Sequence, residues 1–240
     1  MIPLSAIGLP RHKPLKITPI FLLLNILVFV FELLSQNRTQ IFYEFGFIPR
    51  LFFEHQPIPI LTSEGISTFT QALPSWATIL SSMFIHGSFM HLASNMLYLW
   101  VFGQHIERQL GYIQYTLLYL ISGLGASLLH AYIEPSSMIP TVGASGAIAG
   151  ILGAYIVIYP KTKIRTLFLF VFITVINIPA IYVLGLWFIA QLFNGLGSLV
   201  NLNQTNIAYW AHAGGFITGL LLIMFRNFIN WNRSYKNFQY

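Results

Sequence analysis

The sequence predicts an all-α membrane protein with six transmembrane helices. Two observations lead to this fold class. Hydrophobic residues make up 56% of the 240 residues and charged residues only 8%, whereas roughly one quarter of a soluble domain is charged. The apolar residues also gather in runs of about 20 residues, which is the length of a membrane-crossing helix. Cysteine is absent, so disulfides and cysteine-bound metals are excluded.

The first predicted span covers about residues 17–34, and no signal-peptide cleavage site follows it. Residues 35–78 then form the longest loop. Three of its segments between positions 41 and 53 are too apolar for a fully solvated loop, so we expect this first extracytoplasmic loop to lie partly in the membrane interface.

Five further spans follow the first loop. The apolar run over residues 166–200 is longer than one crossing needs, so we assign residues 166–178 to an interfacial segment and the remainder to the fifth span. Residues 201–206 form a polar loop before the last span. The five spans cover about residues 79–103, 112–133, 143–159, 179–199 and 208–225.

Six spans place both chain ends on one side of the membrane. All of the 12 Lys and Arg residues except Arg38 and Arg50 fall on that side. Since cytoplasmic loops carry the excess of basic residues, both termini are predicted to be cytoplasmic. The same topology explains the net charge of +6, because the basic residues lie at the ends of apolar runs and form no patch for a nucleic acid.

Polar residues occur early in spans two, four and six. These three spans run in the same direction, so their polar residues are expected in the extracytoplasmic leaflet. At roughly 100° per residue, His91 and Asn95 project within about 40° of each other, while His86 lies on another side of the helix. The polar residues are His86, His91, Asn95, Ser145 and His212.

Two smooth helix faces indicate how Ser145 and His212 could meet. Small residues recur every four positions in spans four and six, and such faces let helix backbones approach closely. They are Gly146, Gly150 and Ala154 in span four and Gly215 and Gly219 in span six. Packing of these faces would bring Ser145 to His212. Alternatively, Ser145 is itself one more small packing residue of this face.

A Ser145–His212 pair would support acyl transfer. A serine hydroxyl is a weak nucleophile until a base removes its proton, and histidine suits that task. Ser145 would attack and His212 would accept the proton. His91, the Asn95 amide and the backbone N–H of Ser145 are available as donors to the oxyanion. The six carboxylates lie in loops, in the first span or near the cytoplasmic side, so we predict a catalytic dyad and no triad.

The combination of His-x3-Asn in span two, Gly-Ala-Ser-Gly at the head of span four and Ala-His-x2-Gly-x3-Gly in span six resembles the rhomboid family of intramembrane serine proteases. The resemblance covers about residues 76–225. It implies that Ser145 is the nucleophile and His212 the general base. It also implies that His91 and Asn95 stabilise the oxyanion.

The family's fold is a six-helix bundle whose fourth helix starts beneath a water-filled cavity and whose first loop is half submerged. We therefore predict one rhomboid-like membrane domain over residues 1–240, with a core at about 76–225. Residues 1–16 and 226–240 are predicted to be cytoplasmic tails. Two positions depart from common family patterns. Ala77 stands where many members have arginine, which leaves the anchoring of the first loop open, and Ala149 replaces the aromatic on which the catalytic histidine stacks in some members.

The predicted function is an intramembrane serine endopeptidase that cleaves transmembrane or juxtamembrane segments of membrane proteins. A membrane helix protects its carbonyls by hydrogen bonding, so the cut segment must first unwind. We therefore expect the substrate to carry Gly, Pro or polar residues, which weaken a helix, near a small residue at the cleavage site. The partners are transmembrane substrates and the lipid bilayer, in a plasma membrane of bacterial type. No cofactor, metal, nucleic acid or oligomeric state is predicted.

Two other functions are weighed against proteolysis. A non-proteolytic rhomboid-like scaffold would bind and escort membrane proteins, but the presence of both Ser145 and His212 argues against it. A small transporter would need a polar site at the membrane midplane. The polar residues instead cluster toward one leaflet, and no inverted repeat is visible.

Overall fold

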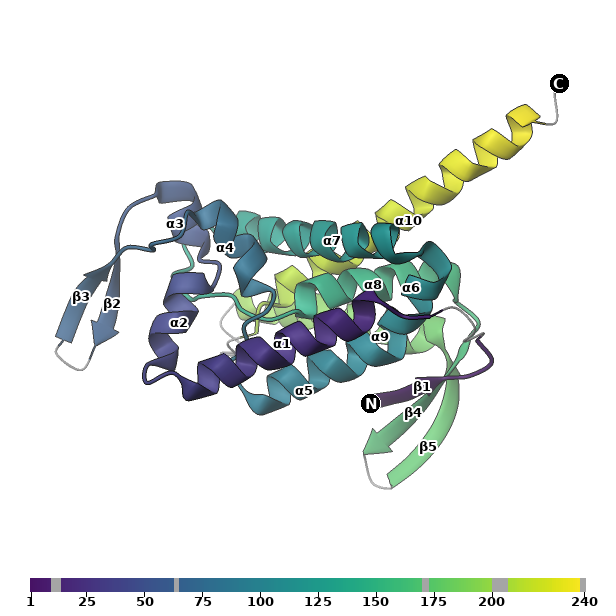
Figure 1. The fold of residues 1–240 in the computed structure, drawn as a ribbon, viewed down its shortest axis with the longest axis horizontal. Coiled ribbons are helices and arrows are strands. Elements are labelled where there is room, and N and C mark those ends of the chain that lie inside the picture. Colours follow the sequence, from purple (N-terminus) through teal and green to yellow (C-terminus); the bar gives the residue numbers. More distant parts are fainter. Residues whose placement is uncertain (10–13, 63–64, 170–172, 200–206, 238–240) are drawn as a thin grey trace.

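The computed structural model describes residues 1–9, 14–62, 65–169, 173–199 and 207–237. Arg11 and Lys13 of the predicted basic tail lie outside the described residues, as does the predicted polar loop 201–206. Most of the described chain is helical, and the long helices run alongside one another as a bundle (Figure 1).

Among the described residues, four helices are long and apolar enough to cross a bilayer, judged by length and composition. They are α1 (Ile17–Leu34), α7 (Tyr112–Ile133), α9 (Ala180–Leu199) and the part Tyr209–Ile229 of α10 (Tyr209–Asn237). A fifth apolar helix, α8 (Ser145–Ile158), is shorter. These five agree with the predicted first, third, fourth, fifth and sixth spans to within about two residues at their starts.

The predicted second span is divided. The helix α4 (Ser75–Ser82) ends before a turn, after which α5 (Phe89–Tyr98), a π-helical turn (Leu99–Gly103) and α6 (Gln104–Leu110) follow one another. The Ser88 hydroxyl caps α5 by accepting the backbone N–H of His91. His86 therefore precedes α5. The prediction that His86 lies on another side of one helix from His91 was wrong, and the two rings are 5.1 Å apart.

The first loop folds into the helices α2 (Arg38–Phe45) and α3 (Pro49–Glu54) and the antiparallel strands β2 (Ile58–Thr62) and β3 (Gly65–Phe69). Backbone hydrogen bonds between Phe47 and Thr141 tie it to the segment before α8. The hydroxyls of Ser75 and Ser81 donate to backbone carbonyls of the loop at 3.1 and 2.7 Å. These contacts anchor the first loop even though position 77 carries an alanine.

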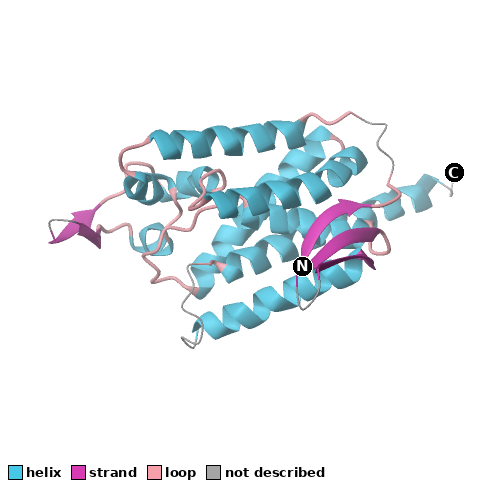
Figure 2. Ribbon diagram, turned by 90° about the horizontal axis from the view of Figure 1, so that it is seen from below, coloured by secondary structure: helices cyan, strands magenta, loops and turns pink. Residues whose placement is uncertain are grey.

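A second sheet lies at the opposite end of the bundle from β2 and β3 (Figure 2). The strands β4 (Lys163–Leu169) and β5 (Ile173–Pro179) form a hairpin where we predicted an interfacial segment. The strand β1 (Ile2–Ala6), from the predicted N-terminal tail, pairs antiparallel with β4. The all-α prediction missed these strands because their β-branched residues, which favour strands, stand within a longer apolar run.

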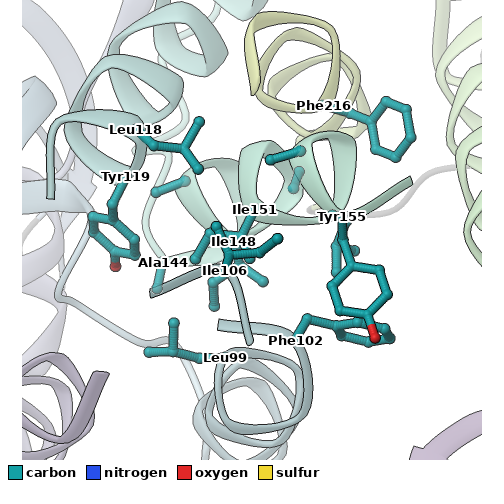
Figure 3. Packing of buried hydrophobic residues seen from close by; sticks show 14 of the residues in the cluster. Leu99, Phe102, Ile106, Leu118, Tyr119, Ala144, Ile148, Ile151, Tyr155 and Phe216 are labelled. Atoms are coloured by element: carbon teal, nitrogen blue, oxygen red, sulfur yellow. The ribbon is translucent and has the colours of Figure 1, made fainter. Parts of the chain in front are cut away.

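The helix α8 forms the centre of the bundle. Every residue from Gly146 to Tyr155 is buried. Apolar side chains from the π-helical turn, α6, α7 and α10 surround it (Figure 3). Those labelled around Ile148, Ile151 and Tyr155 are Leu99, Phe102, Ile106, Leu118, Tyr119 and Phe216. Because α8 is enclosed on several sides, its first residue is held in a defined position.

The predicted small-residue faces pack together. A Cβ added at Gly215 would overlap the carbonyl of Gly146, and one added at Gly219 would overlap the carbonyl of Gly150. Only hydrogen at these positions allows α8 and α10 to approach backbone to backbone. The prediction that spans four and six meet through these glycines is confirmed.

A buried carboxylate joins the start of α1 to α6. Glu107 accepts the backbone N–H groups of Lys16 and Ile17 at 2.7 and 2.8 Å on one oxygen, and that of Thr18 at 2.8 Å on the other. Burial by itself raises the pKa of the Glu107 carboxyl, but the three N–H donors outweigh burial and hold it below its usual range. The ionised carboxylate therefore satisfies three donors that the helix start leaves unpaired.

Replacing Glu107 with glutamine is expected to destabilise the fold by roughly 2–4 kcal/mol, because the amide presents one acceptor oxygen and a competing donor. Since the folded pKa is depressed, the carboxylate's stabilisation is present above the unfolded value near 4.5 and is lost as pH falls through the folded value. Denaturation followed by tryptophan fluorescence in detergent would measure both effects. The exposed Glu54→Gln is the control, with an effect below about 1 kcal/mol. Equal stability of the two variants would contradict the assignment.

Candidate active site

The structure brings Ser145 and His212 together. Ser145 begins α8, and His212 lies in the first turn of α10. The Ser145 Oγ is 2.8 Å from the His212 Nε2, which is hydrogen-bond distance. The backbone contact between Gly146 and Gly215, each close in sequence to one partner, produces this approach.

The other ring nitrogen of His212 meets a residue that the sequence analysis missed. Gln191 on α9 places its Oε1 2.7 Å from the His212 Nδ1. One turn earlier on α9, the Trp187 ring lies 5.9 Å from the His212 ring at an interplanar angle of 35°. The available signal was a polar residue inside a predicted span, which marks function by default. It was missed because that span was interpreted only through its apolar length.

His91 and Asn95 lie against the chain that leads into α8. Gly143 has a φ of +123°, and a Cβ there would come within 2.6–2.7 Å of the His91 ring and 3.7 Å of the Asn95 Nδ2. The Gly143 N–H donates to the Ser82 carbonyl at 2.8 Å. Glycine is required at this position by both its backbone conformation and the lack of space. The two predicted oxyanion donors thus lie beside Gly143, which is two residues before Ser145 in the chain.

The amide of Asn95 is available to a ligand. Its Nδ2 is buried and has no hydrogen-bond acceptor within the described part of the chain. A buried donor without an acceptor costs roughly 1–3 kcal/mol. Such a cost is recovered when a substrate oxygen accepts the bond, which is the role expected of an oxyanion donor.

His86 is placed beside His91, and their ring centroids are 5.1 Å apart. Its backbone N–H donates to the buried Glu32 carboxylate at 3.0 Å. Arg38 of α2 lies 3.7 Å from the same carboxylate and packs over the Phe29 ring. This cluster fixes the turn before α5, so the contacts of His86 are those of a packing residue.

A cavity of about 920 Å³ contains the site. It extends between α2, α5, α7, α8, the middle of α9 and the start of α10, and it is large enough for an extended peptide segment. No group of three or more His, Cys, Asp or Glu residues that could hold a metal occurs in the described ranges. The lining includes Ser145, His212, His91, Asn95, Trp187 and Glu134.

Fold and site together define a helical multi-pass membrane protein with a serine–histidine pair in a cavity between its helices. Residues 74–227 match the family model of the Rhomboid domain. The chain belongs to the rhomboid family.

Several relatives share this region. RHOMBOID-like protein 4 of Arabidopsis thaliana is 37% identical over 151 residues, which are 60% of this chain and 32% of that protein. Rhomboid protein 1, mitochondrial, of Saccharomyces cerevisiae is 34% identical over 60% of this chain and 40% of its own length. Rhomboid protease GluP of Bacillus subtilis is 35% identical over 60% of this chain and 25% of its own length. The chain spans less than half the length of each of these three.

Proposed function

We propose that this protein is an intramembrane serine endopeptidase that cleaves membrane-protein substrates within or near their transmembrane segments. Ser145 is its nucleophile and His212 its general base. The single observation that carries the proposal is the 2.8 Å distance between the Ser145 Oγ and the His212 Nε2, which suits direct proton transfer. A relative at 35% identity bears the name of a protease.

The proposed reaction proceeds by acyl transfer. The Ser145 Oγ attacks the carbonyl carbon of the scissile peptide while the His212 Nε2 takes its proton. The oxyanion is stabilised by the Asn95 Nδ2, by a His91 ring N–H and by the backbone N–H of Ser145. His212 then gives its proton to the leaving amine as the C–N bond breaks. Water, deprotonated by the same base, hydrolyses the acyl-serine and regenerates the free enzyme.

The proposed topology has six spans and a first loop that is half submerged in the outer interface. The two spans beyond the four long helices are α8 and the continuous helix formed by α5 and the π-helical turn, which ends at Gly103 and is followed by the polar α6 on the cytoplasmic side. β1 and the far end of α10 lie at the same end of the bundle (Figure 1), which supports termini on one side. The basic flanks support the cytoplasmic side, in a bacterial-type plasma membrane.

The non-proteolytic scaffold is the weaker alternative. A scaffold needs no hydrogen bond between a serine and a histidine inside a cavity, and it needs no unsatisfied amide beside them. Both features are present at Ser145, His212 and Asn95. A transporter is disfavoured for the same reason.

A fluorophosphonate probe tests the proposal without a known substrate. The detergent-solubilised protein is expected to become labelled at Ser145, as located by mass spectrometry, and His212→Ala should lose the label. The control is His55→Asn, which changes an exposed histidine and keeps a residue that tolerates its left-handed backbone, φ 54°. Folded wild-type protein that stays unlabelled, or a His212→Ala variant that labels normally, would refute the proposed dyad.

A further inference from the structure

We propose that Gln191 is the positioning residue of His212, holding the ring in the tautomer whose Nε2 accepts the Ser145 proton. This inference rests on the proposed function, because it assigns a third participant to the same site. Gln191 contacts the base on Nδ1, the ring nitrogen opposite the one that faces the serine. Its contribution is therefore to orient His212 from α9, as an acidic residue does in a catalytic triad.

The two hydrogen bonds of His212 define one tautomer. A neutral imidazole has one N–H donor and one acceptor nitrogen. The Gln191 Oε1 is only an acceptor and stands 2.7 Å from Nδ1, so Nδ1 carries the hydrogen. Nε2 is then the acceptor, 2.8 Å from the Ser145 Oγ. The opposite tautomer would set two lone pairs against each other at Nδ1 and would remove the basic lone pair from Nε2.

The orientation of the Gln191 amide is set by its own helix. Its Nε2 donates to the Trp187 carbonyl, four residues earlier, at 3.5 Å. A carbonyl oxygen accepts and never donates, so the NH₂ group belongs on that side of the amide. The Oε1 is thereby directed to His212. A flipped amide would lose the bond to Trp187 and present a donor to Nδ1.

The helix α9 supports the His212 ring in a second way. The Trp187 ring lies beside it at 5.9 Å and also lies 6.2 Å from Phe216 on α10. On α8, the residue one turn after Ser145 is Ala149, whose side chain is a single methyl group. Trp187 therefore packs against the side of the His212 ring, where α8 offers only a methyl group. Gln191 adds the hydrogen bond to the Nδ1 of the same ring.

The rate constant for fluorophosphonate labelling of Ser145 tests the role of Gln191. Gln191→Ala is expected to label roughly 10- to 100-fold more slowly, because the ring loses the bond that selects its tautomer. The matched control is Asn194→Ala. This variant removes an amide from the same helix, but one bonded to the backbone carbonyl of Ala190 at 2.8 Å. It should label within about twofold of wild type.

A second variant separates positioning from mere packing. Gln191→Glu keeps an acceptor for the Nδ1–H and adds a charge that favours the imidazolium. Its labelling rate should stay within about tenfold of wild type above neutral pH. On the acid limb of the pH profile, the pH at which labelling falls to half its maximum should rise by about one unit. The other titratable groups that face His212 are His91 on α5 and His130 on α7, and Glu134 lines the same cavity. All three are unchanged in the variant.

The outcomes distinguish the two proposals. If Gln191→Ala labels as fast as wild type, or if Gln191→Glu leaves the acid limb in place, the positioning role is overturned while the dyad stands. If the folded wild-type protein is not labelled at all, the proposed function itself fails. Should Gln191→Ala not fold in detergent, the pH profile of Gln191→Glu decides alone.

Discussion

Replacing Ser145 with alanine is expected to reduce peptide cleavage by roughly 10⁴- to 10⁶-fold, because the proposed acyl intermediate forms on its hydroxyl. The assay uses a fluorogenic single-span peptide in detergent micelles, with Gly-Ala in the outer third of its apolar segment. Helix-weakening residues are placed there because the backbone must unwind before attack. Cleavage is followed by fluorescence, and the cut is located by mass spectrometry.

In the same assay, the cleavage rate of Asn95→Ala is expected to lie between those of wild type and Ser145→Ala. Loss of one oxyanion donor is expected to lower kcat by roughly 10²- to 10³-fold with little change in KM, because the bond strengthens only as the oxyanion forms. The control is Ser198→Ala on α9. The Ser198 hydroxyl donates to the Gly195 carbonyl at 2.8 Å, and its loss should leave the cleavage rate unchanged.

Full cleavage by the Ser145→Ala variant would assign the activity to another residue or to a contaminant.

The Gly219→Ala substitution is expected to destabilise the bundle by about 3 kcal/mol or more. The new Cβ would overlap the Gly150 carbonyl and lie 2.6 Å from the Gly150 Cα. Both contacts are with backbone inside the buried helix α8, which cannot rotate aside as a side chain could. Overpacking of this kind usually costs roughly 1–3 kcal/mol, and the rigid neighbour places this case at the upper end.

A thermal melt in detergent, followed by tryptophan fluorescence, would measure this loss. Gly185→Ala on α9 is the matched control, because a Cβ there would meet no atom within 4 Å. That variant should be as stable as wild type or slightly more stable, since alanine favours helix over glycine by about 1 kcal/mol. Equal melting temperatures for the two variants would show that α8 and α10 are not packed as described.

The catalytic proposal and the stability prediction share one structural cause. The glycines of α8 and α10 allow the two backbones to touch, and this contact sets the distance between Ser145 and His212. A substitution that separates the helices should therefore weaken the fold and slow fluorophosphonate labelling together. Because Gly219 lies two turns from His212, the effect of Gly219→Ala on labelling measures how strongly helix packing controls the Ser145–His212 distance.

Much of the architecture follows from periodicity and length alone. Apolar runs locate α1, α7, α8, α9 and the start of α10, since a bilayer requires such runs. Small residues at every fourth position predicted the contact of α8 with α10, because this spacing produces one smooth face. With that contact, the proximity of Ser145 to His212 could be derived before any coordinates were known.

Tertiary contacts decided the rest. The turn before α5 placed His86 next to His91, since helical angles apply only within a continuous helix. The strands β4 and β5 pair with each other and β4 with β1, and such pairing depends on partners that a local apolar pattern does not identify. The partner of Gln191 could not be identified for the same reason, although a polar residue inside a predicted span was a visible signal. Its role depends on a hydrogen bond to a histidine 21 residues away on another helix, and only packing of α9 against α10 creates that bond.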